Sequence, residues 1–75
     1  MRTVGEIVRQ WRLDADMTQE EMARRTGFRQ TYVSALECNR FMEPGFKRLG
    51  IVVRTLGHSL DELLDLAALR QLTAA

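Results

Sequence analysis

Apolar residues recur three or four positions apart along most of this 75-residue chain, which is the spacing of helices that bury one face. No run shows the sustained alternation of apolar and polar residues that predicts a half-buried strand. We therefore predict an all-α fold with helices over about residues 3–15, 18–26, 30–38, 44–56 and 59–72.

Three of these segments begin with the signature of a capping box, in which a hydroxyl residue precedes a glutamate by three positions. The pairs are Thr3 with Glu6, Thr18 with Glu21, and Ser59 with Glu62. Gly27 and Gly57 provide left-handed helix exits, and Pro44 suits a first helical turn because it lacks an amide hydrogen. These signals set the predicted helix ends.

The apolar stripes of the five helices predict one core in a single domain, residues 1–75. The predicted core residues are Val4, Val8, Trp11, Ala15, Met22, Ala23, Val33, Leu36, Phe46, Leu49, Val53, Leu56, Leu60, Leu63, Leu64 and Ala67. Ile51, Leu66, Leu69 and Leu72 fall outside these stripes. Such unpartnered apolar positions predict an interface between two copies of the chain, with a frayed C-terminal end or scattered surface leucines as the alternative.

Charge is unevenly distributed although the formal net charge is only +1. Residues 17–48 carry a net charge of +2 and residues 51–75 a net charge of −1. A basic middle segment is compatible with nucleic-acid binding, and equally with a solvated surface.

Several function classes are excluded by composition. Cys38 has no disulfide partner, and together with His58 it falls short of the usual four zinc ligands, so we expect no cofactor. His58 is followed by Ser59, but short helices offer no evident pocket for catalysis, so we expect no enzyme. Without a membrane-spanning stretch or a secretory signal, we expect a cytoplasmic protein that binds no membrane.

Residues 18–37 predict two short helices separated at Gly27. A turn of this kind lets the second helix cross the first at a steep angle, and such a helix fits the major groove of DNA, which is about 12 Å wide. The side chains that it would present to base edges are Arg29, Gln30, Thr31 and Ser34.

The same segment resembles the helix-turn-helix of the phage-repressor and Cro family, also called the XRE type. The matching motifs are Thr18-Gln19, Met22-Ala23, Gly27 and Val33-Ser34-x-x-Glu37, and the match extends to Arg12, Pro44, Leu56-Gly57 and residues 59–64. The resemblance covers about residues 4–64. It implies a compact five-helix lambda-repressor-like domain and a sequence-specific transcriptional regulator that binds a pseudo-palindromic operator as a homodimer.

The resemblance also implies roles for individual residues. Arg12 and Glu37 are expected to form a partly buried ion pair, the alternative being two exposed charges. Gln19 is expected to contact a DNA phosphate at a helix N-terminus, the alternative being a solvated glutamine. The full set of expected phosphate-binding residues is Thr18, Gln19, Tyr32, Asn39, Arg40, Lys47 and Arg48. Tyr32 has packing at the domain edge as an equal alternative.

Three positions depart from the family pattern. Asn39 stands where the family often has glycine, but asparagine also tolerates a left-handed turn. Arg29 replaces a common Ser or Thr cap, which predicts a less well capped helix with an added cation. Cys38 replaces a charged or polar residue, so a phosphate contact is not expected there.

The sequence leaves three alternatives for the genetic system that this regulator controls. Length and the run Thr31-Tyr32-Val33-Ser34 resemble controller proteins of restriction–modification systems, and small phage repressors share these features. An antitoxin, or another interaction module with secondary DNA binding, is less favoured because no toxin-wrapping extension follows the last predicted helix. DNA and a second copy are the expected partners, with RNA polymerase or a toxin as further ones. His58 is expected to be a packed or half-exposed turn residue rather than a switch.

Overall fold

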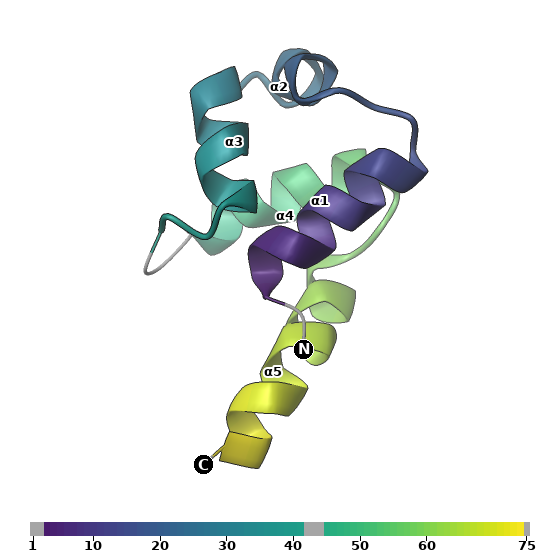
Figure 1. Cartoon of the computed structure of the whole chain (residues 1–75). Coiled ribbons are helices and arrows are strands. Elements are labelled where there is room, and N and C mark those ends of the chain that lie inside the picture. Colours follow the sequence, from purple (N-terminus) through teal and green to yellow (C-terminus); the bar gives the residue numbers. More distant parts are fainter. Residues whose placement is uncertain (1–2, 42–44, 75) are drawn as a thin grey trace.

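The chain folds into five helices in a computed structural model that describes residues 3–41 and 45–74, with side chains described up to residue 67. The helices are α1 (Val4–Asp14), α2 (Gln19–Thr26), α3 (Gln30–Glu37), α4 (Phe46–Thr55) and α5 (Leu60–Ala74) (Figure 1). No strand occurs in the described residues. The predicted all-α fold is confirmed, and every helix end lies within two residues of its predicted position.

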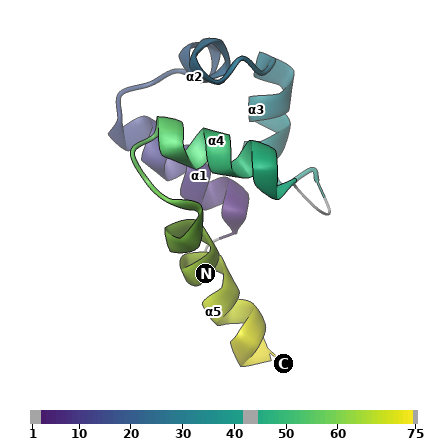
Figure 2. The ribbon, with the colours of Figure 1, turned by 180° about the vertical axis from the view of Figure 1, so that it is seen from behind.

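α2 and α3 lie at one end of the molecule and α5 at the other, with α1 and α4 between them (Figures 1 and 2). α3 packs against both α2 and α1, whereas α4 packs against α2 and α5. The last turns of α5 extend away from this body in both views. The segment formed by α2 and α3 therefore packs on α1 and α4.

The core collects apolar side chains from all five helices, as the amphipathic pattern predicts. The largest fully buried side chains are Ile7, Val8, Met22, Val33, Leu49, Val52, Val53 and Leu63. Among the α5 side chains up to residue 67, Leu63 is buried, and Leu60 and Ala67 pack against the core beside it. The start of α5 is thus part of the domain core.

Two predicted core residues, Ala15 and Phe46, are exposed, and a third, Leu64, is half-buried but lies outside the core cluster. Ala15 is exposed because α1 ends one residue earlier, which makes Ala15 the C-cap residue rather than part of the helical stripe. Phe46 is 65% exposed because it is the first residue of α4, at the end that adjoins the α3–α4 connection. The fully buried Ile7 and Val52 fill these helix faces instead. The prediction that Pro44 begins the fourth helix lies outside the described residues.

The capping signals at α1 and α2 differ in outcome. The box of Thr3 and Glu6 is complete, since each residue bonds the amide of the other at 3.2 Å. Thr18 Oγ1 accepts from the Glu21 amide at 3.0 Å, but the Glu21 carboxylate bonds Arg24 instead of completing a box. The hydrogen bond from Arg24 lowers the pKa of Glu21.

The α4–α5 turn is fixed by His58. Its ring stacks on Trp11 of α1 with centroids 3.7 Å apart and an interplanar angle of 5°. Its Nδ1 lies 3.0 Å from Glu62 Oε2. Ser59 Oγ accepts a hydrogen bond from the Glu62 amide, but the Glu62 carboxylate contacts His58 and does not complete a capping box with Ser59. His58 is half-buried, as predicted for a packed turn residue. These contacts attach the beginning of α5 to α1.

Candidate nucleic-acid interface

The turn between α2 and α3 places α3 across the end of α2. Gly27 ends α2 with φ of 79°, and its amide donates to Ala23 O at 2.9 Å. Because this left-handed conformation is unfavourable for residues with a Cβ, glycine is required here for its backbone rather than for space. α3 then begins at Gln30 and runs along one edge of the molecule, crosswise to α2 (Figure 1).

The outer face of α3 carries the residues predicted to read bases. Arg29, Gln30 and Thr31 are exposed and Ser34 is half-buried, whereas Val33 on the inner face is fully buried. The structure thus brings the predicted set together on one side of one helix. Arg29 is the N-cap residue of α3 and forms no capping hydrogen bond with its side chain, as its lack of a hydroxyl predicts.

A buried ion pair joins α3 to α1. Arg12 Nε lies 2.6 Å from Glu37 Oε2, and Arg12 Nη2 donates to Glu37 Oε1 at 3.0 Å. The two side chains are 8% and 2% exposed. Arg12 Nη1 also donates to Met17 O at 2.7 Å, and Gln19 Nε2 donates to Glu37 Oε1 at 3.1 Å. A network of this kind satisfies the buried charges and fixes the helix in position.

Gln19 and Thr18 lie at the N-terminus of α2, where phosphate contacts were predicted. Gln19 is half-buried, and its bond to Glu37 differs from the solvated glutamine considered as the alternative. The positive end of the α2 dipole is exposed beside Thr18. The α2 N-terminus is therefore coupled through Glu37 to the end of α3.

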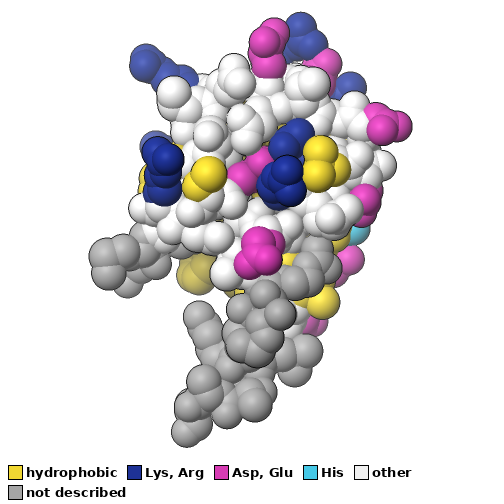
Figure 3. Space-filling model, in the orientation of Figure 1, with side chains coloured by type: hydrophobic (Ala, Val, Ile, Leu, Met, Phe, Trp, Pro, Cys, Tyr) yellow, Lys and Arg dark blue, Asp and Glu magenta, His cyan; other side chains and the backbone are white. Residues whose placement is uncertain are grey.

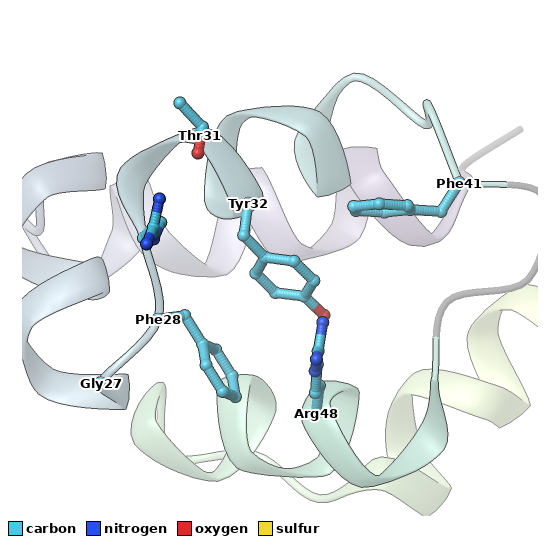
Figure 4. Close-up of a pocket in the computed structure, with 7 residues that line it drawn as sticks. Gly27, Phe28, Thr31, Tyr32, Phe41 and Arg48 are labelled. Carbon is cyan, nitrogen blue, oxygen red and sulfur yellow. The ribbon is translucent and has the colours of Figure 1, made fainter.

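Tyr32 packs between two aromatic rings. Its ring centroid lies 5.1 Å from that of Phe28 and 5.3 Å from that of Phe41, and the guanidinium carbon of Arg48 lies 5.7 Å from its centroid (Figure 4). The Tyr32 Oη atom is buried and has no hydrogen-bond partner among the described residues. Burial raises the pKa of Tyr32, and the Arg48 charge partly opposes this. These contacts fit the packing alternative predicted for Tyr32.

A hollow of about 460 Å³ lies beside this aromatic group. Its lining comprises Gly27, Phe28, Arg29, Thr31, Tyr32, Phe41 and Arg48. Sequence reasoning missed Phe28 and Phe41. The spacing of Phe28 and Tyr32 by four residues could have indicated the first contact, but Phe41 follows α3 and gives no local signal.

The predicted phosphate-binding cations flank α3 on its C-terminal side. Arg40 follows the helix, and Lys47 and Arg48 lie in the first turn of α4; all three are exposed. Figure 3 shows basic side chains along the α3 edge, and further basic side chains at the centre and the top, where acidic side chains lie beside them. Asn39 has φ of 56°, so the predicted left-handed turn is confirmed.

The predicted dimer residues are only partly described. Ile51 is half-buried on α4, and Leu66 on α5 is 43% exposed. Leu69 and Leu72 lie outside the residues whose side chains the structure describes. The backbone carries both on the part of α5 that extends from the body (Figure 2).

The site offers no metal centre and the fold no membrane span in the part of the chain that the structure describes. Residues 3–41 and 45–67 hold no group of three or more His, Cys, Asp or Glu side chains that could bind a metal ion. None of the described helices is long and apolar enough to cross a bilayer.

The fold and the exposed face of α3 define a helix-turn-helix DNA-binding domain, the class to which transcriptional regulators of this architecture belong. The family model described as "Helix-turn-helix domain" matches residues 5–69. The chain belongs to this family, and within it to the XRE type that its motifs resemble.

Solved structures of regulators share the fold. The biofilm master regulator SinR, solved in complex with DNA, superposes with a TM-score of 0.77 at 27% identity, over 83% of this chain and 98% of that one. SinR in its complex with SinI gives 0.78 at 28% identity, over 84% of this chain and 61% of that one. The clp gene regulator ClgR from Corynebacterium glutamicum gives 0.80 at 32% identity, over 95% and 76%. No curated protein sequence matches the chain.

Proposed function

We propose that this protein is a sequence-specific transcriptional regulator that binds a pseudo-palindromic operator as a homodimer, with α3 in the major groove. The observation that carries the proposal is the row of polar side chains on the outer face of α3, whose inner face is fully buried and tied to α1. A helix that reads bases has to present its side chains at fixed positions, and this attachment supplies the necessary rigidity.

In this arrangement the first turn of α3 carries most of the base recognition. Arg29 is suited to guanine and Gln30 to adenine, because each side chain can form two hydrogen bonds to one base edge. Thr31 and Ser34 add hydroxyl groups that can donate or accept. The set thus combines two long side chains that select bases with two short ones that allow close approach of the helix.

Phosphate contacts on both sides of α3 would hold it in the groove. Thr18 and Gln19 present the N-terminus of α2 to one backbone strand, since free amides and the helix dipole favour an anion there. The other strand would meet the cations at the α3–α4 connection. The proposed contacts on that side are Asn39, Arg40, Lys47 and Arg48, whereas the buried Tyr32 hydroxyl is left to the packing role. The solved complex of SinR with DNA supports double-stranded DNA as the ligand.

The homodimer is proposed to form mainly through α5. Leu66 is exposed, and Leu69 and Leu72 follow it at helical spacing on the segment that extends from the body. Ile51 of α4 adds a smaller contribution. A two-fold axis at this contact would place two copies of α3 about 34 Å apart, one turn of DNA, and would require an inverted repeat in the operator.

Within this class we propose a controller protein of a restriction–modification system, on the strength of the run Thr31-Tyr32-Val33-Ser34. Such a regulator would also meet RNA polymerase at its promoter. An endonuclease gene beside the coding sequence would support this assignment. A neighbouring phage cluster would favour a phage-type repressor, and a toxin gene would favour an antitoxin that holds the toxin on its folded surface.

Selection from a random DNA library tests the proposed function. We expect the wild-type protein to enrich one sequence with two inverted half-sites, centred about 10 base pairs apart. The variant that combines Arg29→Ala with Gln30→Ala should retain its fold but lose this enrichment, because both positions are exposed. Recovery of random sequences by the wild-type protein would contradict sequence-specific recognition, and a single half-site would contradict the symmetric dimer.

A further inference from the structure

Asn39 follows the C-cap residue of α3 and also accepts a hydrogen bond from Gly5 of α1, which lies 34 residues earlier in the chain. Its backbone adopts the left-handed conformation, and its amide donates to Leu36 O at 3.1 Å. Its side-chain Oδ1 accepts a hydrogen bond from the Gly5 amide at 3.0 Å. Gly5 belongs to the first turn of α1, where amides have no partner within the helix. One asparagine therefore satisfies the ends of two helices.

The contact depends on glycine at position 5. A Cβ there would lie 2.5 Å from Leu36 O, 2.7 Å from Glu37 O and 2.7 Å from Asn39 Oδ1. Two of these atoms are backbone carbonyl oxygens, which cannot rotate away as a side chain can. The positive N-terminal end of α1 thus meets the negative C-terminal end of α3 directly, which is a favourable arrangement of helix dipoles.

Together with the pair of Arg12 and Glu37, this contact attaches α3 to α1 at two separate points. Val33 and Leu36 hold the inner face of α3 in the core, and a second polar attachment beyond its last residue adds a restraint on rotation about Glu37. Glycine at position 39 would permit the same turn but would provide no acceptor for Gly5. The asparagine is therefore explained by its side chain and not by its backbone alone.

We propose that Asn39 is a positioning residue, which orients α3 for base recognition through its hydrogen bond to Gly5. This proposal rests on the proposed function of α3. A phosphate contact changes the affinity for every DNA sequence alike, whereas a displaced helix loses contacts that only the correct sequence provides. The measure of positioning is therefore the ratio of the dissociation constants for scrambled and selected DNA.

Four variants separate these roles. Asn39→Gly keeps the turn and removes the acceptor, and we expect it to lower the ratio by about threefold to tenfold, the effect of one hydrogen bond. Gly5→Ala should lower the ratio too, although it leaves Asn39 able to contact a phosphate. Asn39→Asp retains an acceptor and should preserve the ratio. Cys38→Ser, at the adjacent exposed position, is the matched control and should also preserve it.

Amide hydrogen exchange tests the contact without DNA. The Gly5 amide should exchange about tenfold faster in Asn39→Gly than in the wild type and Cys38→Ser. The Glu6 amide, which bonds Thr3 Oγ1, is the internal reference and should change little. Unchanged Gly5 exchange would overturn the contact. If Asn39→Gly weakened binding to selected and scrambled DNA equally, the positioning role would be overturned and a phosphate role would remain.

These outcomes are distinguishable from failure of the proposed function. A wild-type protein that binds all DNA alike would overturn both base reading by α3 and the role of Asn39 in it. Exchange data would still show whether the Gly5–Asn39 bond exists. A wild-type protein that discriminates, with an Asn39→Gly ratio equal to its own, would overturn the positioning role alone.

Discussion

Arg12 and Glu37 form a two-point ion pair inside the protein, with contacts of 2.6 Å and 3.0 Å between guanidinium and carboxylate. Glu37 is the last residue of α3 and Arg12 lies in the last turn of α1. Two parallel hydrogen bonds fix orientation as well as distance, which a lysine in place of Arg12 would not do. The pair therefore helps to fix the orientation of α3 relative to α1.

Removal of one partner should destabilise the fold strongly. We expect Glu37→Ala to reduce the free energy of unfolding by about 3–5 kcal/mol, because the Arg12 charge is left buried and unpaired. Glu37→Gln keeps one acceptor and should cost less. Urea denaturation of Glu37→Ala, Arg12→Ala and the double variant measures the coupling. Additive effects of the two single variants would contradict a direct interaction.

Tyr32 should ionise above the ordinary range of a tyrosine. Burial disfavours the phenolate and raises the pKa of Tyr32, and this effect outweighs the opposing charge of Arg48. Because the folded state retains the proton more strongly, the stability of the fold should be fully retained up to about pH 10, the unfolded pKa, and should fall as the pH rises from there through the folded pKa.

Ultraviolet absorbance of the phenolate measures this titration directly, since the chain contains one tyrosine. The same titration in concentrated urea provides the control and should give the ordinary pKa. Identical curves for folded and unfolded protein would show that Tyr32 Oη is not buried between Phe28, Phe41 and Arg48.

Dimer formation should depend on Leu66, which is exposed, and on Leu69, which follows it on α5. We expect the wild-type protein to sediment as a dimer at tens of micromolar, and the variant with Leu66→Glu and Leu69→Glu to sediment as a monomer. Leu13→Glu is the matched control, because Leu13 on α1 has the same 43% exposure as Leu66. A monomeric wild type, or an intact dimer in the double variant, would remove this interface.

The fold could be predicted largely from the sequence because helix periodicity and end signals are local. Periodicity fails where a helix extends past the core. Phe46 follows the α4 stripe in spacing but is the first residue of the helix, so the pattern predicted burial where the structure gives 65% exposure. It also failed to select Val52, whose fully buried position depends on how α4 packs on α2 and α5.

The candidate site was predictable in residue type but not in its supporting contacts. The polar row of α3 follows from helical spacing, and the pairing of Arg12 with Glu37 came from family resemblance. The bond between Gly5 and Asn39 had no such signal. It depends on the close approach of the first turn of α1 to the end of α3, which no local pattern encodes.

In the proposed complex, α3 reads bases while the start of α4 holds the DNA backbone. The most direct test of this arrangement is the affinity of Gln30→Ala and Lys47→Ala for selected and scrambled DNA over a series of salt concentrations. Arg29→Ala and Arg48→Ala repeat the comparison within each group.

Gln30→Ala should lose about 1–3 kcal/mol of discrimination between the two DNAs and keep the salt dependence of the wild type. Lys47→Ala should weaken binding to both DNAs alike and reduce the salt slope by about one. If Lys47→Ala changed the base preference while Gln30→Ala left it intact, the proposed placement of α3 in the major groove would be contradicted.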